Sequence, residues 1–162
     1  MFIRFISTGG TIDKIYFDAM SQFEVGDSQV KHILTEGLAA FDYDIVPMFR
    51  KDSLEFTDDD RNKLREFIES DDATRFVITH GTDTMVQSAA AISGIVGKSI
   101  VLTGALSPAR FKGTDAIFNV GLAVAAVQLV SPGVYIAMNG QVFAANDVWK
   151  NREENRFEKL PR

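Results

Sequence analysis

"FISTGGTIDKIYFD" (Phe5–Asp18) is a short apolar run that ends abruptly at two glycines framed by threonines. Such a run, followed directly by Gly9 and Gly10, is typical of a buried strand that turns into a loop. Three interpretations of the loop are open: a plain strand-to-loop turn, a phosphate-binding loop, or the seat of a threonine nucleophile. Phosphate binding is the weakest, because the chain has neither of the glycine-rich nucleotide-binding patterns and no lysine at the required place.

Similar apolar runs recur along the chain and alternate with segments of helical period. We expect strands at Phe2–Ser7, Tyr43–Phe49, Phe76–Thr79, Ile100–Thr103 and Val134–Met138, with a further strand at Gln141–Phe143. Nearly continuous apolar strands are typical of sheets that are buried on both faces. The alternation predicts an α/β fold: a single three-layer domain over residues 1–162, with a mostly parallel sheet and helices on both faces, Rossmann-like or flavodoxin-like.

Four helices are expected between these strands. Thr57 caps one of them, because its hydroxyl can accept a backbone N–H and the aspartates after it suit the positive helix end. The helix from Val30 has an apolar face that includes Leu38. The helix from Asp115 places Phe118, Leu122, Ala125 and Leu129 together on one side.

Composition excludes several classes of protein and site. Hydrophobic residues make up 46% of the 162 residues and charged residues 24%, as in a soluble globular domain. The net charge of -5 argues against nucleic-acid and anionic-membrane partners. No cysteine is present, and His32 and His80 are the only histidines, so we expect no metal and no other cofactor. The amino terminus has neither a membrane span nor the form of a secretory signal, which predicts a cytoplasmic location.

Three of the expected strands end in small polar residues. They are followed by Thr8-Gly9-Gly10-Thr11, by "HGTDT" at His80–Thr84, and by "GALSPARFKGTD" at Gly104–Asp115. Ligands of parallel sheets bind outside the carboxyl ends of the strands, so these segments can converge on one site. Plainer interpretations stay open: Asp83 as a helix cap, His80 as a hydrogen-bonded core residue, and Lys150 as a solvated surface lysine.

Together these segments resemble the asparaginase family of the bacterial, threonine-nucleophile type. This family also contains glutaminase-asparaginases and an amidotransferase subunit. The matching motifs are "TGGTI" at Thr8–Ile12, "DS" at Asp52–Ser53, "HGTDTM" at His80–Met85, "VLTGAL" at Val101–Leu106, "FN" at Phe118–Asn119 and "NDVWK" at Asn146–Lys150. The likeness covers nearly the whole chain, but only the amino-terminal domain of a usual family member.

The resemblance implies an amidohydrolase that cleaves the side-chain amide of L-asparagine, or a close analogue, to aspartate and ammonia. It implies Thr11 as the nucleophile, Thr82 as the hydroxyl that handles the attacking water, and Lys150 as the residue that activates Thr82. Asp83 then holds the substrate ammonium, and Ser53 helps to hold the carboxylate. Asp52, in the same "DS" motif, is also expected to bind the substrate. Gly10 and Gly81 allow the substrate to approach the backbone. A partly buried Lys150 can act as a base toward Thr82.

One departure from the family concerns the proton relay to the nucleophile. Family members use a tyrosine on a loop just downstream, whereas the corresponding residue here is Phe23 in "QFEVG". Tyr16 lies on the same expected loop and can take this role. The alternative is that Tyr16 only packs against apolar neighbours.

A second departure concerns the carboxy-terminal domain. Usual family members have this domain, and we expect it to be absent here. Either the site is then more open, or another copy of this domain closes it. We therefore expect a homodimer or higher homo-oligomer, which would also cover the apolar loop "KIYFDAMSQF".

Two competing functions are weighed against amide hydrolysis. One is a catalytically impaired domain that binds an amino acid or a protein partner. The other is a nucleotide-binding α/β domain, which the missing phosphate-binding patterns disfavour. The joint presence of Thr11, Thr82, Asp83 and Lys150 favours the enzyme, because pure binding does not require two hydroxyls and a lysine.

Overall fold

The central element of the fold is a sheet whose strands run mostly in parallel. The computed structural model describes residues 1–17 and 22–161, and in this part of the chain six strands form the sheet in the order β4-β1-β5-β6-β7-β8. All neighbours pair in parallel except β7 and β8. The strands are β1 Phe2–Gly9, β4 Asp42–Lys51, β5 Arg75–Thr79, β6 Ser99–Thr103, β7 Gly133–Met138 and β8 Gln141–Ala144. Each expected strand is confirmed, with ends that differ by at most two residues.

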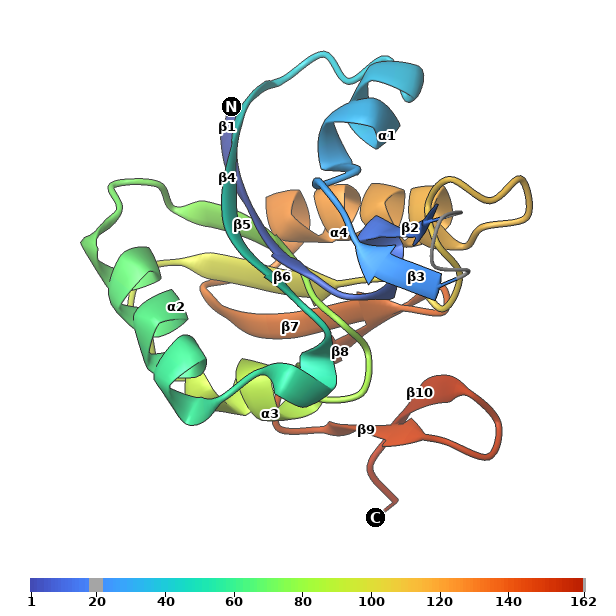
Figure 1. The fold of residues 1–162 in the computed structure, drawn as a ribbon. Coiled ribbons are helices and arrows are strands. Elements are labelled where there is room, and N and C mark those ends of the chain that lie inside the picture. The colour runs from blue at the N-terminus through green and yellow to red at the C-terminus, as the bar shows by residue number, and fades with distance from the viewer. Residues whose placement is uncertain (18–21, 162) are drawn as a thin grey trace.

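Helices cover both faces of this sheet, as predicted (Figure 1). On one face lie α1, Val30–Glu36, and α4, Ala116–Leu129; on the other lie α2, Asp58–Ser70, and α3, Met85–Ala91. Each pair buries its own apolar cluster against the sheet. The α/β, three-layer fold with a mostly parallel sheet is therefore confirmed.

The amino terminus of α2 is fixed by the cap that the sequence predicts. Thr57 Oγ1 accepts a hydrogen bond from the Asp60 N–H, and the Asp60 carboxylate accepts one from the Thr57 N–H at 2.8 Å. The same carboxylate contacts Lys51 Nζ at 2.9 Å. This capping box therefore ties the start of α2 to the carboxyl end of β4.

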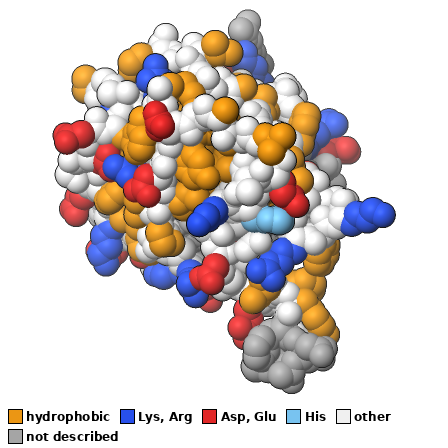
Figure 2. Space-filling model, turned by 90° about the horizontal axis from the view of Figure 1, so that it is seen from above, with side chains coloured by type: hydrophobic (Ala, Val, Ile, Leu, Met, Phe, Trp, Pro, Cys, Tyr) orange, Lys and Arg blue, Asp and Glu red, His pale blue; other side chains and the backbone are white. Residues whose placement is uncertain are grey.

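One expectation about helix faces is wrong, and a second face, on α4, is the exposed one. Leu38 lies beyond α1 with φ 51° and is 85% exposed, because the helix ends at Glu36. The side of α4 that carries Phe118 and Leu129 faces outward, while Asn119, Val120, Ala123 and Val127 are buried. Since α4 is apolar all round, periodicity could not choose its buried side. Figure 2 shows apolar side chains gathered on this face of the molecule, over α1 and α4.

Two hairpins were not predicted. The segment after Thr11, expected as a loop, begins with a short 3-10 turn and then forms β2, Lys14–Phe17, which pairs antiparallel with β3, Gln22–Val25. Residues 18–21 of the expected apolar loop lie outside the described residues. Near the carboxyl end, β9, Val148–Asn151, pairs with β10, Arg156–Lys159, and places Lys150 on a strand. Among the described residues, no helix has the length and apolarity needed to cross a bilayer.

Candidate active site

The carboxyl ends of β1 and β5 meet through two glycines. A Cβ atom on Gly10 would lie 2.5 Å from the Cα atom of Gly81, and Gly10 has a φ of +87°, so both space and backbone conformation require glycine there. The chain passes from β1 to β4 on one side and then to β5 on the other, which makes the β1–β5 boundary the topological switch point. Ligands of open parallel sheets bind at such a point. Thr11 and Thr82, which directly follow these glycines, are thereby brought close together.

The two threonines that frame the first glycine pair have different surroundings. Thr8 is 1% exposed, and its hydroxyl donates to the Thr79 carbonyl at 2.9 Å, joining β1 to β5. Thr11 begins the 3-10 turn Thr11–Asp13 and is partly exposed. The Thr8 hydroxyl thus serves the fold, and Thr11 is the threonine of this loop that a substrate can reach.

Ser53 joins the two glycines at the same point. A Cβ atom on Gly81 would lie 2.5 Å from the Ser53 Cβ atom, and the Ser53 carbonyl accepts a hydrogen bond from Thr84 Oγ1 at 2.7 Å. Asp52 points elsewhere: its carboxylate pairs with Lys14 Nζ at 2.9 Å, and this contact lowers the pKa of Asp52. The structure therefore gathers Gly10, Gly81 and Ser53, while Asp52 anchors the neighbouring β2 strand.

Lys150 reaches the same loop from β9. Its Nζ atom donates to Thr82 Oγ1 at 2.8 Å and to Asp83 Oδ1 at 2.8 Å. The Lys150 side chain is 11% exposed, whereas that of Asp83 is 38% exposed and so accessible to a ligand. Lys150 is therefore no solvated surface lysine, and Asp83 forms no side-chain cap on α3, whose cap position is Thr84.

Tyr16 lies on β2 directly opposite Phe23 of β3. The two rings pack edge to face with centroids 5.5 Å apart, and Tyr16 is 53% exposed. Phe23 in turn packs against Phe111 at 5.9 Å. Within residues 1–17 and 22–161, no hydrogen bond joins the Tyr16 hydroxyl to Thr11. As cross-strand partners, Tyr16 and Phe23 lie side by side at the same level of the hairpin.

Burial of the carboxyl group of Asp13, the last residue of the Thr11–Asp13 turn, was not predicted from the sequence. Asp13 is fully buried, and it accepts hydrogen bonds from Ser7 Oγ at 2.9 Å and from the Gln29 N–H at 2.8 Å. Burial raises the pKa of Asp13 to about 6, although both hydrogen bonds act in the opposite direction. An aspartate directly after an apolar strand and its turn was the available signal, since a charged group there has little access to water.

Replacing Asp13 by asparagine should change how stability depends on pH. The folded-state pKa of Asp13 is raised from 3.8 to about 6, so its contribution is fully present below pH 3.8 and is lost as the pH rises through 6. Relative to Asp13→Asn, the wild-type free energy of unfolding should fall by about 2.4 kcal/mol between pH 4 and pH 7. Urea unfolding at several pH values measures this difference.

The wild type must be compared with the variant because titration of His80 changes the free energy of unfolding in the opposite direction over the same pH range. Burial lowers the pKa of His80 from 6.5 to about 4, so its contribution is present above 6.5 and is lost as the pH falls through 4. Asp59→Asn, at an exposed position of α2, is the matched control. Equal pH dependence in wild type and Asp13→Asn would show that Asp13 does not titrate in this way.

The family model "Asparaginase, N-terminal" matches residues 2–158. The chain belongs to the asparaginase family. The resemblance read from the motifs is thereby confirmed over nearly all of the chain.

Individual relatives match in part. Over 80 residues the chain is 41% identical to "Probable L-asparaginase periplasmic" of Haemophilus influenzae, covering 46% of this chain and 23% of the relative. It is 34% identical over 93 residues to "Glutaminase-asparaginase" of Acinetobacter glutaminasificans, covering 54% and 28%. The solved structure of L-asparaginase I from Vibrio cholerae is 26% identical, with a TM-score of 0.82, covering 99% of this chain and 52% of that one. The chain thus spans about half of a solved relative.

Proposed function

We propose that this asparaginase-family chain hydrolyses the side-chain amide of L-asparagine, or of a close analogue, to aspartate and ammonia through a threonyl acyl-enzyme. The observation that carries this proposal is the contact of Lys150 with both Thr82 and Asp83, beside the Gly10–Gly81 contact that brings Thr11 near. A nucleophilic hydroxyl, a second hydroxyl with a lysine, and a carboxylate are the groups that acyl transfer to and from an amino-acid amide requires.

In the first half of the reaction, Thr11 Oγ attacks the carboxamide carbon. A C–O bond forms, the C–N bond breaks, and the amide nitrogen leaves as ammonia with the proton that Thr11 gives up. Tyr16 is the proposed relay for this proton, since its phenol lies on the hairpin that begins just after the Thr11 turn. Backbone N–H groups of the glycine-containing loops can stabilise the negative oxygen that forms during attack.

In the second half, water attacks the acyl group on Thr11. A water proton passes to Thr82, which passes its own to Lys150 in its neutral amine form. As the ester C–O bond breaks, this proton returns through Thr82 to the Thr11 oxygen and restores its hydroxyl. Asp83, bonded to the same Lys150, provides the charge that holds the substrate ammonium. Ser53 lies against Gly81, where it can contact the substrate carboxylate. No resident cofactor or metal is part of the proposal.

Ammonia release from asparagine, glutamine and short amides by the purified protein tests this function. Release from asparagine, with aspartate as the second product, is expected. Binding of asparagine without ammonia release would instead support the alternative, an impaired amino-acid-binding or protein-interaction domain. The exposed position of Tyr16, away from any hydrogen bond to Thr11 in the described residues, favours that alternative.

Tyr16→Phe should slow turnover about 10²-fold, the scale of a lost proton relay. Phe23→Leu is the matched variant, because Phe23 is the cross-strand partner of Tyr16 and carries no phenol. It should lower kcat only slightly. Equal, small effects of both changes on kcat would remove Tyr16 from the mechanism.

The expected homo-oligomer and cytoplasmic location stay predictions. Support for self-association comes from the aromatic side chains of Tyr16, Phe23 and Phe111, which pack in a row and are each about half exposed. Exposed apolar clusters of this kind mark interaction surfaces.

A further inference from the structure

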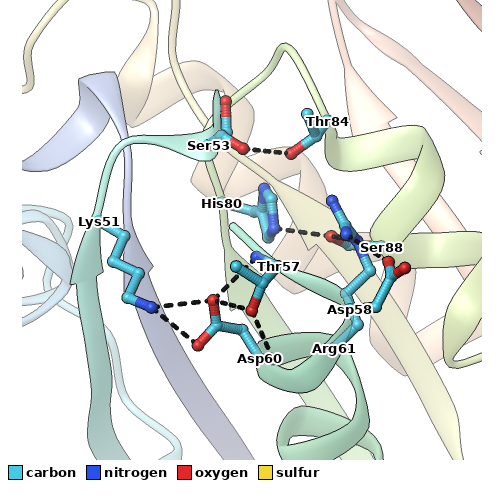
Figure 3. Close-up of polar contacts among 9 residues, drawn as sticks. All are labelled: Lys51, Ser53, Thr57, Asp58, Asp60, Arg61, His80, Thr84 and Ser88. Atoms are coloured by element: carbon cyan, nitrogen blue, oxygen red, sulfur yellow. Dashed lines mark hydrogen bonds and ion pairs between the residues drawn. The ribbon is translucent and has the colours of Figure 1, made fainter. Parts of the chain in front are cut away.

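A buried polar chain runs from α2 through α3 to the loop that carries Thr82. The His80 ring is fully buried; its Nδ1 lies 2.8 Å from the Gly81 carbonyl oxygen, and its Nε2 lies 2.9 Å from Ser88 Oγ. Arg61 Nε donates to the same Ser88 oxygen at 3.2 Å, and Arg61 Nη1 contacts Asp58 at 2.9 Å. Figure 3 shows the contacts that join His80, Ser88, Arg61 and Asp58.

The partners determine where each proton lies. The Gly81 carbonyl can only accept, so His80 Nδ1 carries the ring proton. Nε2 is then the acceptor and Ser88 the donor, while the Ser88 oxygen accepts from Arg61, which can only donate. Burial and the Arg61 charge both disfavour a second proton on the ring, and the pKa of His80 is lowered to about 4.

The far end of this chain holds the peptide bond before Thr82. The carbonyl and the N–H of a trans peptide point in opposite directions, so the bond from His80 to the Gly81 carbonyl also sets the direction of the Thr82 N–H. Two further contacts fix the ring and its backbone. The Phe56 ring packs edge to face on the His80 ring, with centroids 4.7 Å apart. Gly104 leaves room for the His80 carbonyl oxygen, because a Cβ atom on Gly104 would lie 2.3 Å from it.

We propose that Ser88 and Arg61 are positioning residues, which hold neutral His80 as its Nδ1–H tautomer and thereby fix the Gly81–Thr82 peptide for reaction. This inference rests on the proposed function for its kinetic consequence only. His80 holds the peptide bond directly before Thr82, whereas Asp83 lies one residue further on and also contacts Lys150, so the chain acts mainly on Thr82 and less on the ammonium site.

Ser88→Ala tests the proposal. It removes the donor to His80 Nε2 and the acceptor of Arg61, and a small displacement of Thr82 should lower kcat about 10- to 100-fold. KM for asparagine should change only about twofold, because Asp83 keeps its contact with Lys150. Ser93→Ala is the matched control, since its hydroxyl only bonds the Ala89 carbonyl at the end of the same helix. Equal kinetics of the two variants would overturn the proposal.

A readout that does not depend on activity accompanies the kinetics. Nitrogen NMR of the imidazoles is simple here, because His32 and His80 are the only histidines and His32→Gln assigns them. The wild-type His80 ring should be neutral at pH 7 with its proton on Nδ1. A proton on Nε2, or a charged ring, would contradict the inference. In Ser88→Ala the Thr82 amide proton should exchange faster with solvent; unchanged exchange would also contradict it.

These measurements keep two failures apart. If the wild type releases no ammonia while the tautomer and the Thr82 exchange behave as expected, the proposed function fails and the positioning role stands. If Ser88→Ala does not fold, Arg61→Gln compared with Arg65→Gln provides the same test. Arg65 lies one turn further along α2 and bonds the carbonyls of Ala91 and Ser93.

Discussion

Thr11→Ala is expected to lower ammonia release from asparagine by ~10³-fold or more while leaving the fold intact. Without the Thr11 hydroxyl no acyl-enzyme can form. The fold should tolerate the change because the neighbouring Thr8, and not Thr11, donates the hydrogen bond that joins β1 to β5. Steady-state ammonia assays measure the activity, and thermal unfolding checks the fold.

Thr35→Ala is the matched control for this variant. Thr35 is exposed on α1, and its hydroxyl bonds only the Lys31 carbonyl one turn earlier. It should keep wild-type turnover. Wild-type activity in folded Thr11→Ala would show that another group is the nucleophile.

Lys150→Met is expected to lower kcat by about 10³-fold, with a smaller change in KM. The variant removes the amine that contacts Thr82 Oγ1 at 2.8 Å, so Thr82 loses its proton acceptor for the second half of the reaction. Asp83 also loses its contact with Lys150. The substrate ammonium can take that place, which is why binding should suffer less than turnover.

Asp83→Ala should have the opposite profile, with a strong loss of asparagine binding, because the substrate ammonium then has no counter-charge. Calorimetric titration with asparagine or aspartate separates the two variants. Lys63→Met, at an exposed lysine of α2, is the control for the loss of a lysine. Weak binding in Lys150→Met together with normal binding in Asp83→Ala would mean that the two roles are exchanged.

Much of this site could be predicted from sequence because local patterns determine it. Apolar runs that stop at Gly9 and at His80 locate strand ends, and parallel strands bring those ends to one edge of the sheet. The positions of Gly10 and Gly81 then follow, since only glycine leaves room for so close a backbone contact. The contact of Lys150 with Thr82 was expected from the family resemblance and not from any local sequence pattern.

The remaining features depend on contacts between distant segments. The β2–β3 hairpin was not predicted for two reasons. Each strand has only four residues, which is too short for hydrophobic periodicity to recognise, and no turn motif in the sequence marks the pair. The Asp13 carboxylate accepts a hydrogen bond from the Gln29 N–H, sixteen residues away, and Ser88 accepts one from Arg61 of another helix. The sequence could not show that the side of α4 with Phe118 and Leu129 faces outward, because this helix has no polar stripe to orient it.

The most direct test of the central claim is to locate the acyl group during turnover. Lys150→Met mixed with asparagine should accumulate the aspartyl ester, because attack of water is slowed more than attack by Thr11. After acid quench and proteolysis, mass spectrometry should find the ester on the peptide that contains Thr11, and Thr11→Ala should show none. An aspartyl ester on Thr82, or one that persists in Thr11→Ala, would contradict the account.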